Sequence, residues 1–104
     1  MTGLFIKKYH VAVLEEDENF LAKMIGAMKT WYQGHIVVEG FTDSRNMFEA
    51  INLSKAKNRP FDLAILSSDE FLEKMVLKQS VPSLNVVMCN DVASLRIAAS
   101  RCLI

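Results

Sequence analysis

Apolar residues gather in four short runs along the chain, and a polar stretch follows each run. The most continuous run is Leu-Ala-Ile-Leu at residues 63–66, which lies between Pro60 and Ser67. An unbroken apolar run of this length is typical of a parallel strand that is covered on both faces. Three further runs, rich in Val and Ile, favour the extended state in the same way, at residues 9–14, 35–41 and 84–89.

Between these runs the apolar residues recur three and four positions apart, which is the spacing of one helical face. Asp, Asn, Ser or Thr stands at the start of each such segment, where its side chain can cap the free backbone amides. In the third helix, Phe71, Leu72, Met75 and Val76 are expected to face the core, and residues 54–60 before it are expected to form a polar surface loop. The pattern predicts four helices, at residues 17–31, 42–53 and 68–79 and from residue 90 onward.

The alternation of strands and helices predicts one α/β domain, in which helices cover both faces of an open parallel sheet. Residues 101–104 would add a short fifth strand. The carboxyl ends of parallel strands meet at one edge of the sheet. We therefore expect Glu15, Glu16, Ser67 and Asn90 to be neighbours at that edge.

The charges and apolar runs of the chain limit the classes of function that it can have. Twelve Lys and Arg residues match twelve Asp and Glu residues, and no basic stretch is dense enough to predict nucleic-acid binding by this domain. No apolar run approaches the roughly 20 residues that span a bilayer, so no membrane insertion is expected. The charges at the start of the chain follow its apolar residues, unlike those of a secretory signal. These features predict a cytoplasmic domain.

The cysteines and histidines suggest no further chemistry. Cys89 and Cys102 both lie in apolar runs, where a free cysteine acts as a small hydrophobic residue. His10 and His35 stand at the beginnings of strands, at the opposite edge of the sheet from Ser67. We therefore expect neither a disulfide, nor a cysteine-based metal site, nor a catalytic histidine.

Three strings resemble parts of the receiver domains of bacterial response regulators: Val-Ala-Val-Leu-Glu-Glu-Asp at residues 11–17, Asp-Leu-Ala-Ile-Leu-Ser at 62–67 and Leu-Asn-Val-Val-Met-Cys-Asn at 84–90. They are similar to the first, third and fourth strands of those domains. The similarity covers essentially the whole chain in the order and spacing of its elements. It implies a flavodoxin-like, doubly wound parallel sheet with strand order 2-1-3-4-5, built by residues 1–104 as one receiver-like domain.

The family's site is carried over only in part. In receivers the first strand ends in acids that hold Mg²⁺, the third in the phosphorylated aspartate and the fourth in a Thr or Ser that orients the phosphoryl group. Here Glu15 and Glu16 stand at the acidic pair as a weak Mg²⁺ candidate, Ser67 at the phosphoacceptor position, and Asn90 at the switch position. An acyl phosphate needs a carboxylate nucleophile, so Ser67 predicts a pseudo-receiver that is not phosphorylated. Its expected role is binding without catalysis or a cofactor: protein-protein interaction, dimerisation or localisation in bacterial signalling.

Receivers also end with a fifth helix, which covers one face of the sheet together with the first. The sequence leaves no residues for that helix, so the resemblance predicts an apolar sheet face open to a protein partner or a second copy. The chain ends inside the apolar run Cys102-Leu103-Ile104. We interpret it as the N-terminal fragment of a longer protein.

Two alternatives stay open. Asp69, two residues after Ser67, is a candidate shifted phosphoacceptor, which would make the domain a working switch that is modified by a small phosphodonor and Mg²⁺. A small nucleotide- or flavin-binding α/β domain is the other reading, since the same fold supports it. Against that reading, no Gly-rich turn follows the first strand to let a phosphate approach the backbone.

Overall fold

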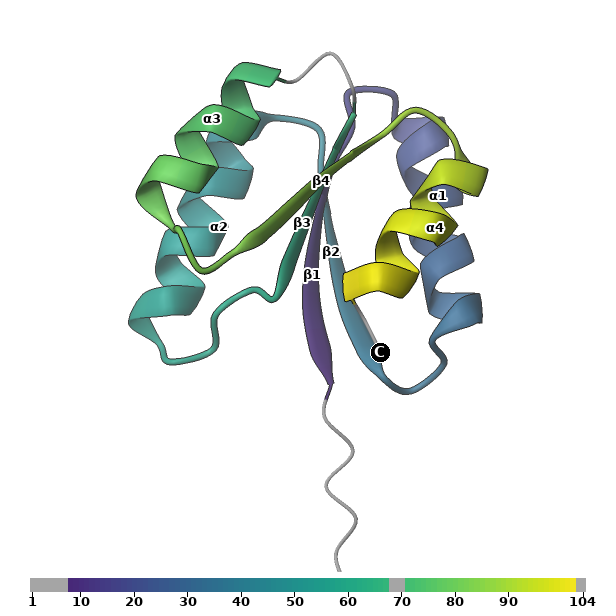
Figure 1. Cartoon of the computed structure of the whole chain (residues 1–104), viewed down its shortest axis with the longest axis horizontal. Helices are drawn as coiled ribbons and strands as arrows, with labels where there is room; N and C mark the ends of the chain where they lie inside the picture. The colour runs from purple at the N-terminus through teal and green to yellow at the C-terminus, as the bar shows by residue number, and fades with distance from the viewer. Residues whose placement is uncertain (1–7, 68–70, 103–104) are drawn as a thin grey trace, which may run out of the picture.

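A computed structural model of the chain describes residues 8–67 and 71–102. Four strands form one sheet in the order β2-β1-β3-β4, and every neighbouring pair is parallel (Figure 1). The two central strands, β1 and β3, carry the residues that are fully buried on both faces, as the unbroken apolar runs predicted. The strands are β1 (Tyr9–Leu14), β2 (Ile36–Phe41), β3 (Leu63–Ser67) and β4 (Asn85–Cys89).

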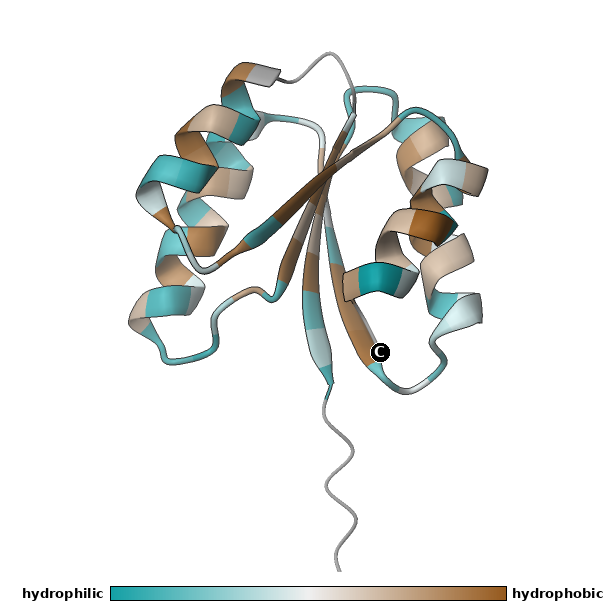
Figure 2. Cartoon of the chain, in the orientation of Figure 1, coloured by the Kyte–Doolittle hydropathy of each residue, from teal (hydrophilic) through white to brown (hydrophobic). Residues whose placement is uncertain are grey.

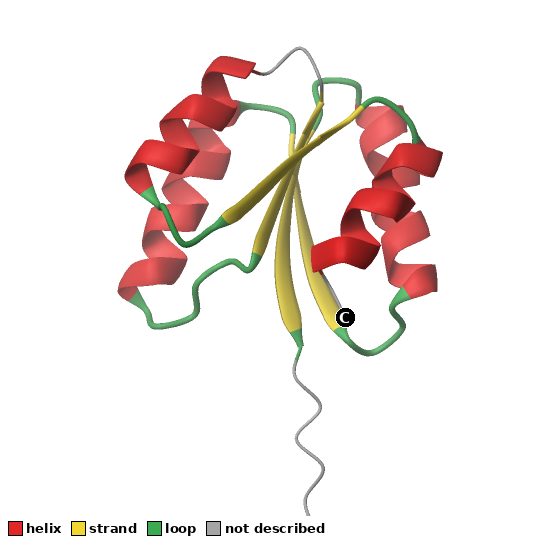
Figure 3. Ribbon diagram, viewed as in Figure 1, coloured by secondary structure: helices red, strands yellow, loops and turns green. Residues whose placement is uncertain are grey.

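Helices cover both faces of this sheet, which confirms the predicted α/β class (Figures 1 and 3). Side chains of β1 point alternately to the two faces of the sheet. Val11 and Val13 face α1 and α4, whereas Ala12 and Leu14 face α2 and α3. Each face therefore has its own apolar core. The helices are α1 (Glu18–Trp31), α2 (Ser44–Ala56), α3 (Phe71–Ser80) and α4 (Val92–Cys102).

The predicted fifth strand is wrong for the residues that the structure describes. Arg101 and Cys102 continue α4, and residues 103 and 104 lie outside the described part. The topology gives the reason, because α4 lies on the same face as α1. A right-handed crossover on that face leads from β1 to β2, so a strand after α4 would be carried toward β2 and not beyond β4. The five-strand order 2-1-3-4-5 is therefore replaced by a four-stranded sheet.

The expected uncovered face is covered by the same helix. Leu95 and Ala99 of α4 are fully buried against the side chains of Met24 and Met28 on α1. The guanidinium of Arg96 also lies over the ring of Trp31, 5.4 Å from its centroid, which links the two helices at the surface. Within the described residues, α1 and α4 together cover this side of the sheet, where the receiver resemblance required a fifth helix.

The second helix is longer than predicted. It begins at Ser44, with Asp43 as its cap, and it continues through residues 54–56, which were expected to form a loop. Its end is set by Asn58, whose backbone adopts a left-handed conformation with φ of 61°. The amides of Asn58 and Arg59 then donate to the carbonyls of Lys55 and Ser54, at 3.2 and 2.8 Å. This is the usual hydrogen-bonding pattern of a Schellman helix end.

The third helix has the opposite orientation from the one predicted. Leu77 is its fully buried side chain, whereas Leu72, Met75 and Val76 are 73%, 46% and 46% exposed. Periodicity alone cannot choose between two apolar stripes on one helix, and here the stripe that continues into Val81 faces the core. The described side chains of the expected inner face therefore form a surface. The side chain of Phe71 lies outside the described part.

Candidate functional site

The carboxyl ends of β1, β3 and β4 lie side by side, as predicted. Leu14 pairs with Leu66, and Ser67 pairs with Cys89, in the parallel register of the sheet. Glu15 and Asn90 directly follow the first and last of these strands. The predicted site positions therefore share one sheet edge, while Asp69 lies outside the described residues.

One member of the acidic pair at this edge, Glu15, is hydrogen-bonded within its own loop. An oxygen of the half-buried Glu15 carboxylate accepts a hydrogen bond from the Asp17 amide at 3.0 Å, whereas Glu16 is exposed. In the described part of the chain, no three His, Cys, Asp or Glu side chains come together as a metal-binding group. Mg²⁺ requires near-octahedral oxygen coordination. Two adjacent carboxylates fit weak Mg²⁺ binding at most.

Capping of α4 falls to Asp91 and not to Asn90. A carboxylate oxygen of Asp91 accepts a hydrogen bond from the Ser94 amide at 2.7 Å, and the Ser94 hydroxyl donates to the Asp91 carbonyl at 3.1 Å. The hydrogen bonds from the Ser94 backbone, and then from its side chain, lower the pKa of Asp91. Asn90 is exposed and stands just before this cap.

The thiol at the same edge is not poised for chemistry. Cys89 is buried at the end of β4, and its burial, followed by the negative charge of Asp91, raises the pKa of the thiol. Only the thiolate is a good nucleophile, so this shift disfavours reaction. Cys89 and Cys102 are both free cysteines.

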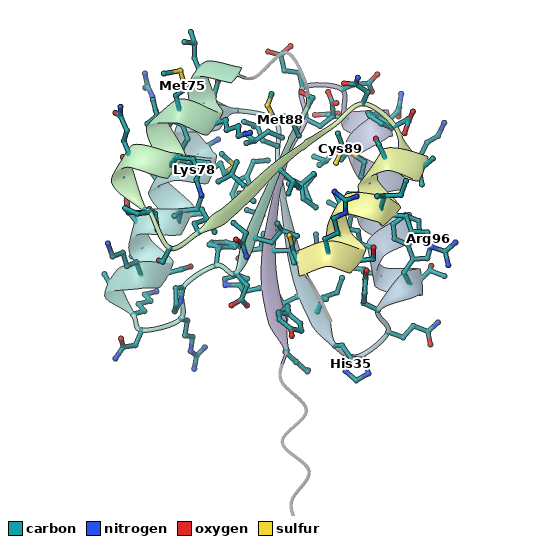
Figure 4. All side chains as sticks on the ribbon, viewed as in Figure 1. His35, Met75, Lys78, Met88, Cys89 and Arg96 are labelled. Atoms are coloured by element: carbon teal, nitrogen blue, oxygen red, sulfur yellow. The ribbon has the colours of Figure 1, made fainter. Side chains whose placement is uncertain are left out.

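A second candidate site lies on α3, which presents an apolar surface to solvent. We call the exposed side chains of Leu72, Met75 and Val76 the α3 ridge. Figure 2 shows hydrophobic colour along this helix, and Figure 4 places Met75 on its outer side, away from the sheet. A groove of about 150 Å³ runs beside the ridge between α2 and α3, lined by Phe48, Ile51, Asn52, Val76, Leu77, Ser80 and Val81.

The inner side of α3 carries the half-buried carboxylate of Glu73. One carboxylate oxygen of Glu73 is buried and has no hydrogen-bond partner. Lys78 is exposed, and its ammonium donates to the Leu84 carbonyl at 3.3 Å (Figure 4). A buried acceptor without a partner opposes folding, and so does exposed apolar area. The orientation of α3 therefore exposes its apolar residues to solvent and lowers the stability of the isolated domain.

A third group of side chains, at the amino-terminal edge, was missed by sequence reasoning. His10, Glu39 and Asp62 lie on three adjacent strands or just before them, and they line one depression with a volume of about 530 Å³. Each is followed two positions later by a residue that faces the α2 and α3 core. This alternation, compared across the three strands, is the sequence signal that could have found them. His10 was instead set aside because of its distance from Ser67.

Two comparisons with known proteins found no match. No model of a protein family matches the chain, and no curated protein is similar to it. Within the described residues, none of the helices combines the length and the apolar character needed to cross a membrane.

Proposed function

We propose that this chain is a receiver-like domain that transfers no phosphoryl group and acts as a protein-binding module in bacterial signalling. The four-stranded parallel sheet with helices on both faces is compatible with a flavodoxin-like arrangement. In this reading the domain works in the cytoplasm, and its output is binding, dimerisation or localisation.

The carboxyl edge of the sheet supports the non-catalytic part of the proposal. Ser67 supplies a hydroxyl where phosphorylation would require a carboxylate. Glu15 is hydrogen-bonded to its own loop, and Asp91 is engaged as a helix cap. Glu15 and Asp91 at this edge thus have local structural roles.

The α3 ridge is the observation that carries the binding part. Exposed apolar side chains that are scattered singly are ordinary, but Leu72, Met75 and Val76 are contiguous on one helix face and adjoin a groove. A protein partner would bury the ridge and place an apolar side chain in the groove, as in helix-in-groove recognition.

Site-specific photo-crosslinking tests the ridge. A photoreactive residue at position 75 is compared with one at position 97, because Ile97 on α4 is similarly apolar and 58% exposed but lies on the other helix layer. We expect a discrete protein adduct from position 75, lost in the Leu72→Ser variant, and none from position 97. Sedimentation velocity on the purified chain then shows whether the adduct is a second copy. Equal adducts from both positions, or none from either, would contradict the proposal.

Phosphoryl transfer is tested separately by intact mass. The purified chain is incubated with acetyl phosphate and Mg²⁺ beside a Ser67→Asp variant, with a phosphorylatable receiver domain as the positive control. We expect no phosphoryl adduct on the natural sequence. An adduct that maps to Asp69, Glu15 or Glu16 would make the domain a switch and overturn the non-catalytic reading.

A further inference from the structure

The depression at the amino-terminal edge lies on the sheet face that α2 and α3 cover only in part. On that face, Ala12 and Leu14 of β1 are buried beneath the helices, whereas His10 is only half-buried and lines the depression. Asp62 stands in the same way before the buried Ala64. The uncovered end of the sheet face therefore forms a polar floor.

His10 is fixed in this floor from several sides. Its ring stacks on the buried ring of Phe61 with centroids 3.6 Å apart. Ring nitrogen Nε2 pairs with the Glu39 carboxylate, and Nδ1 lies 3.3 Å from the Arg59 carbonyl oxygen. The His10 amide donates to the Asp62 carboxylate at 2.8 Å. Both ring nitrogens thus face an oxygen acceptor, and the stacking on Phe61 holds the ring in place, so His10 serves as a positioning group.

Three cationic side chains line the rim. Lys57 is the cap of α2, and Arg59 lies two residues later, on the turn that the left-handed Asn58 creates. Lys8 directly precedes β1. Because the Schellman hydrogen bonds fix the turn, the positions of Lys57 and Arg59 are set by the fold.

The charges of the depression do not balance. Three cations stand against two carboxylates, and both carboxylates are engaged with His10, Glu39 through the ring and Asp62 through the amide. Val37 and Pro60 add an apolar part to the lining. The volume of about 530 Å³ lies within the range of small-molecule sites.

We propose that this depression binds a small organic anion, a carboxylate or a phosphate monoester, whose apolar body lies against Val37 and Pro60. The guanidinium of Arg59 is suited to bidentate contact with such a group, and Lys57 adds a second charge. The site lies at the opposite edge of the sheet from Ser67, and it does not depend on the binding role of the α3 ridge.

Backbone amide NMR tests the site with defined probes. The full chain is titrated at low ionic strength with phenyl phosphate, with benzoate, with inorganic phosphate and with neutral benzyl alcohol. We expect saturable shifts for the amides around the depression, including those of Val37 and Asp62, with phenyl phosphate or benzoate. Inorganic phosphate should bind more weakly because it lacks an apolar body, and benzyl alcohol should not saturate.

Charge variants make the test specific. The Lys57→Gln, Arg59→Gln double variant should weaken the aromatic anion at least about tenfold, a loss of the size expected for charge-assisted contacts. The control is Lys23→Gln, Lys29→Gln, which removes the same charge from exposed positions on α1 and should change the affinity less than about twofold. Shifts that stay linear up to about 20 mM, or equal weakening in both double variants, would overturn the proposal.

Discussion

The two helix layers of this molecule use similar residues in opposite ways. On one face, α1 and α4 pack against each other and bury Met24, Met28, Leu95 and Ala99 in a shared core. On the other face a groove separates α2 from α3, and Met75 is nearly half exposed. The difference teaches that apolar composition does not decide a helix's role. What decides it is whether the apolar stripe faces the sheet or solvent.

The sharpest test compares two methionines. Met28→Ala removes a fully buried side chain from α1, so we expect it to lower the free energy of unfolding by about 2–5 kcal/mol. Met75→Ala removes the same atoms from the α3 ridge and should change that free energy by no more than about 0.5 kcal/mol. Urea denaturation followed by circular dichroism measures both values.

If Met75→Ala lowered the free energy of unfolding as much as Met28→Ala, the proposed difference between a buried and an exposed methionine would be wrong. It would mean that the ridge is buried in the purified chain, for example against a second copy. Repeating the denaturation over a range of protein concentrations separates these cases, because only an associated state becomes more stable as concentration rises.

The inner side of α3 offers a stabilising change. Glu73→Met replaces a carboxylate that has a buried, unpartnered oxygen with an apolar side chain of similar length. We expect it to raise the free energy of unfolding by about 1–3 kcal/mol, the size of the desolvation penalty that it removes. Glu49→Met, at an exposed position on α2, is the control and should have an effect within about 0.5 kcal/mol. No gain over this control would mean that Glu73 is adequately solvated.

Short stretches of sequence were enough to predict a feature of the fold where few alternative structures fitted the same residues. The strand at residues 63–67 followed from the unbroken apolar run at 63–66, and a polar cap was expected at the start of the first helix, where Asp17 provides it. The convergence of the strand ends near Ser67 followed from parallel pairing. These features depend on the type and spacing of residues that are close in the chain, and both can be read directly from the sequence.

Long-range choices could not be predicted in this way. Both sides of α3 offer apolar residues, so only packing shows that Leu77 is buried and Met75 is exposed. The four residues 101–104 are too few for their period to separate strand from helix. The His10 depression joins segments that are far apart in the sequence: His10 and Asp62 are 52 positions apart, and their contact depends on the register of β1 and β3.

The surface contact between α1 and α4 gives a smaller effect. Arg96→Ala removes the guanidinium above Trp31, and cation–π pairs at exposed sites contribute about 0.5–1 kcal/mol. A double-mutant cycle with Trp31→Leu should return a coupling energy of that size. The same cycle with Arg101→Ala is the control and should return none. Coupling in both cycles would point to a general charge effect in place of a specific contact.

The smallest effect concerns the cap of α4 and its dependence on pH. The pKa of Asp91 is lowered in the folded state, so the cap contributes stability above the ordinary value of 3.8 and loses it as pH falls through the lowered folded value. Asp91→Asn keeps a capping oxygen but cannot titrate, so its stability difference from the natural chain should narrow below about pH 4. Urea denaturation at a series of pH values between neutral and acid measures this difference.

A second variant tells the two hydrogen bonds of that cap apart. Ser94→Ala removes the hydroxyl but keeps the backbone amide, which is the larger cause of the lowered pKa of Asp91. We therefore expect this variant to retain most of the acid dependence that Asp91→Asn removes. If Ser94→Ala abolished that dependence, the hydroxyl would be the dominant partner of the carboxylate. The cap of α4 would then depend mainly on the Ser94 side chain, whereas the structure shows mainly the hydrogen bond from the Ser94 backbone amide.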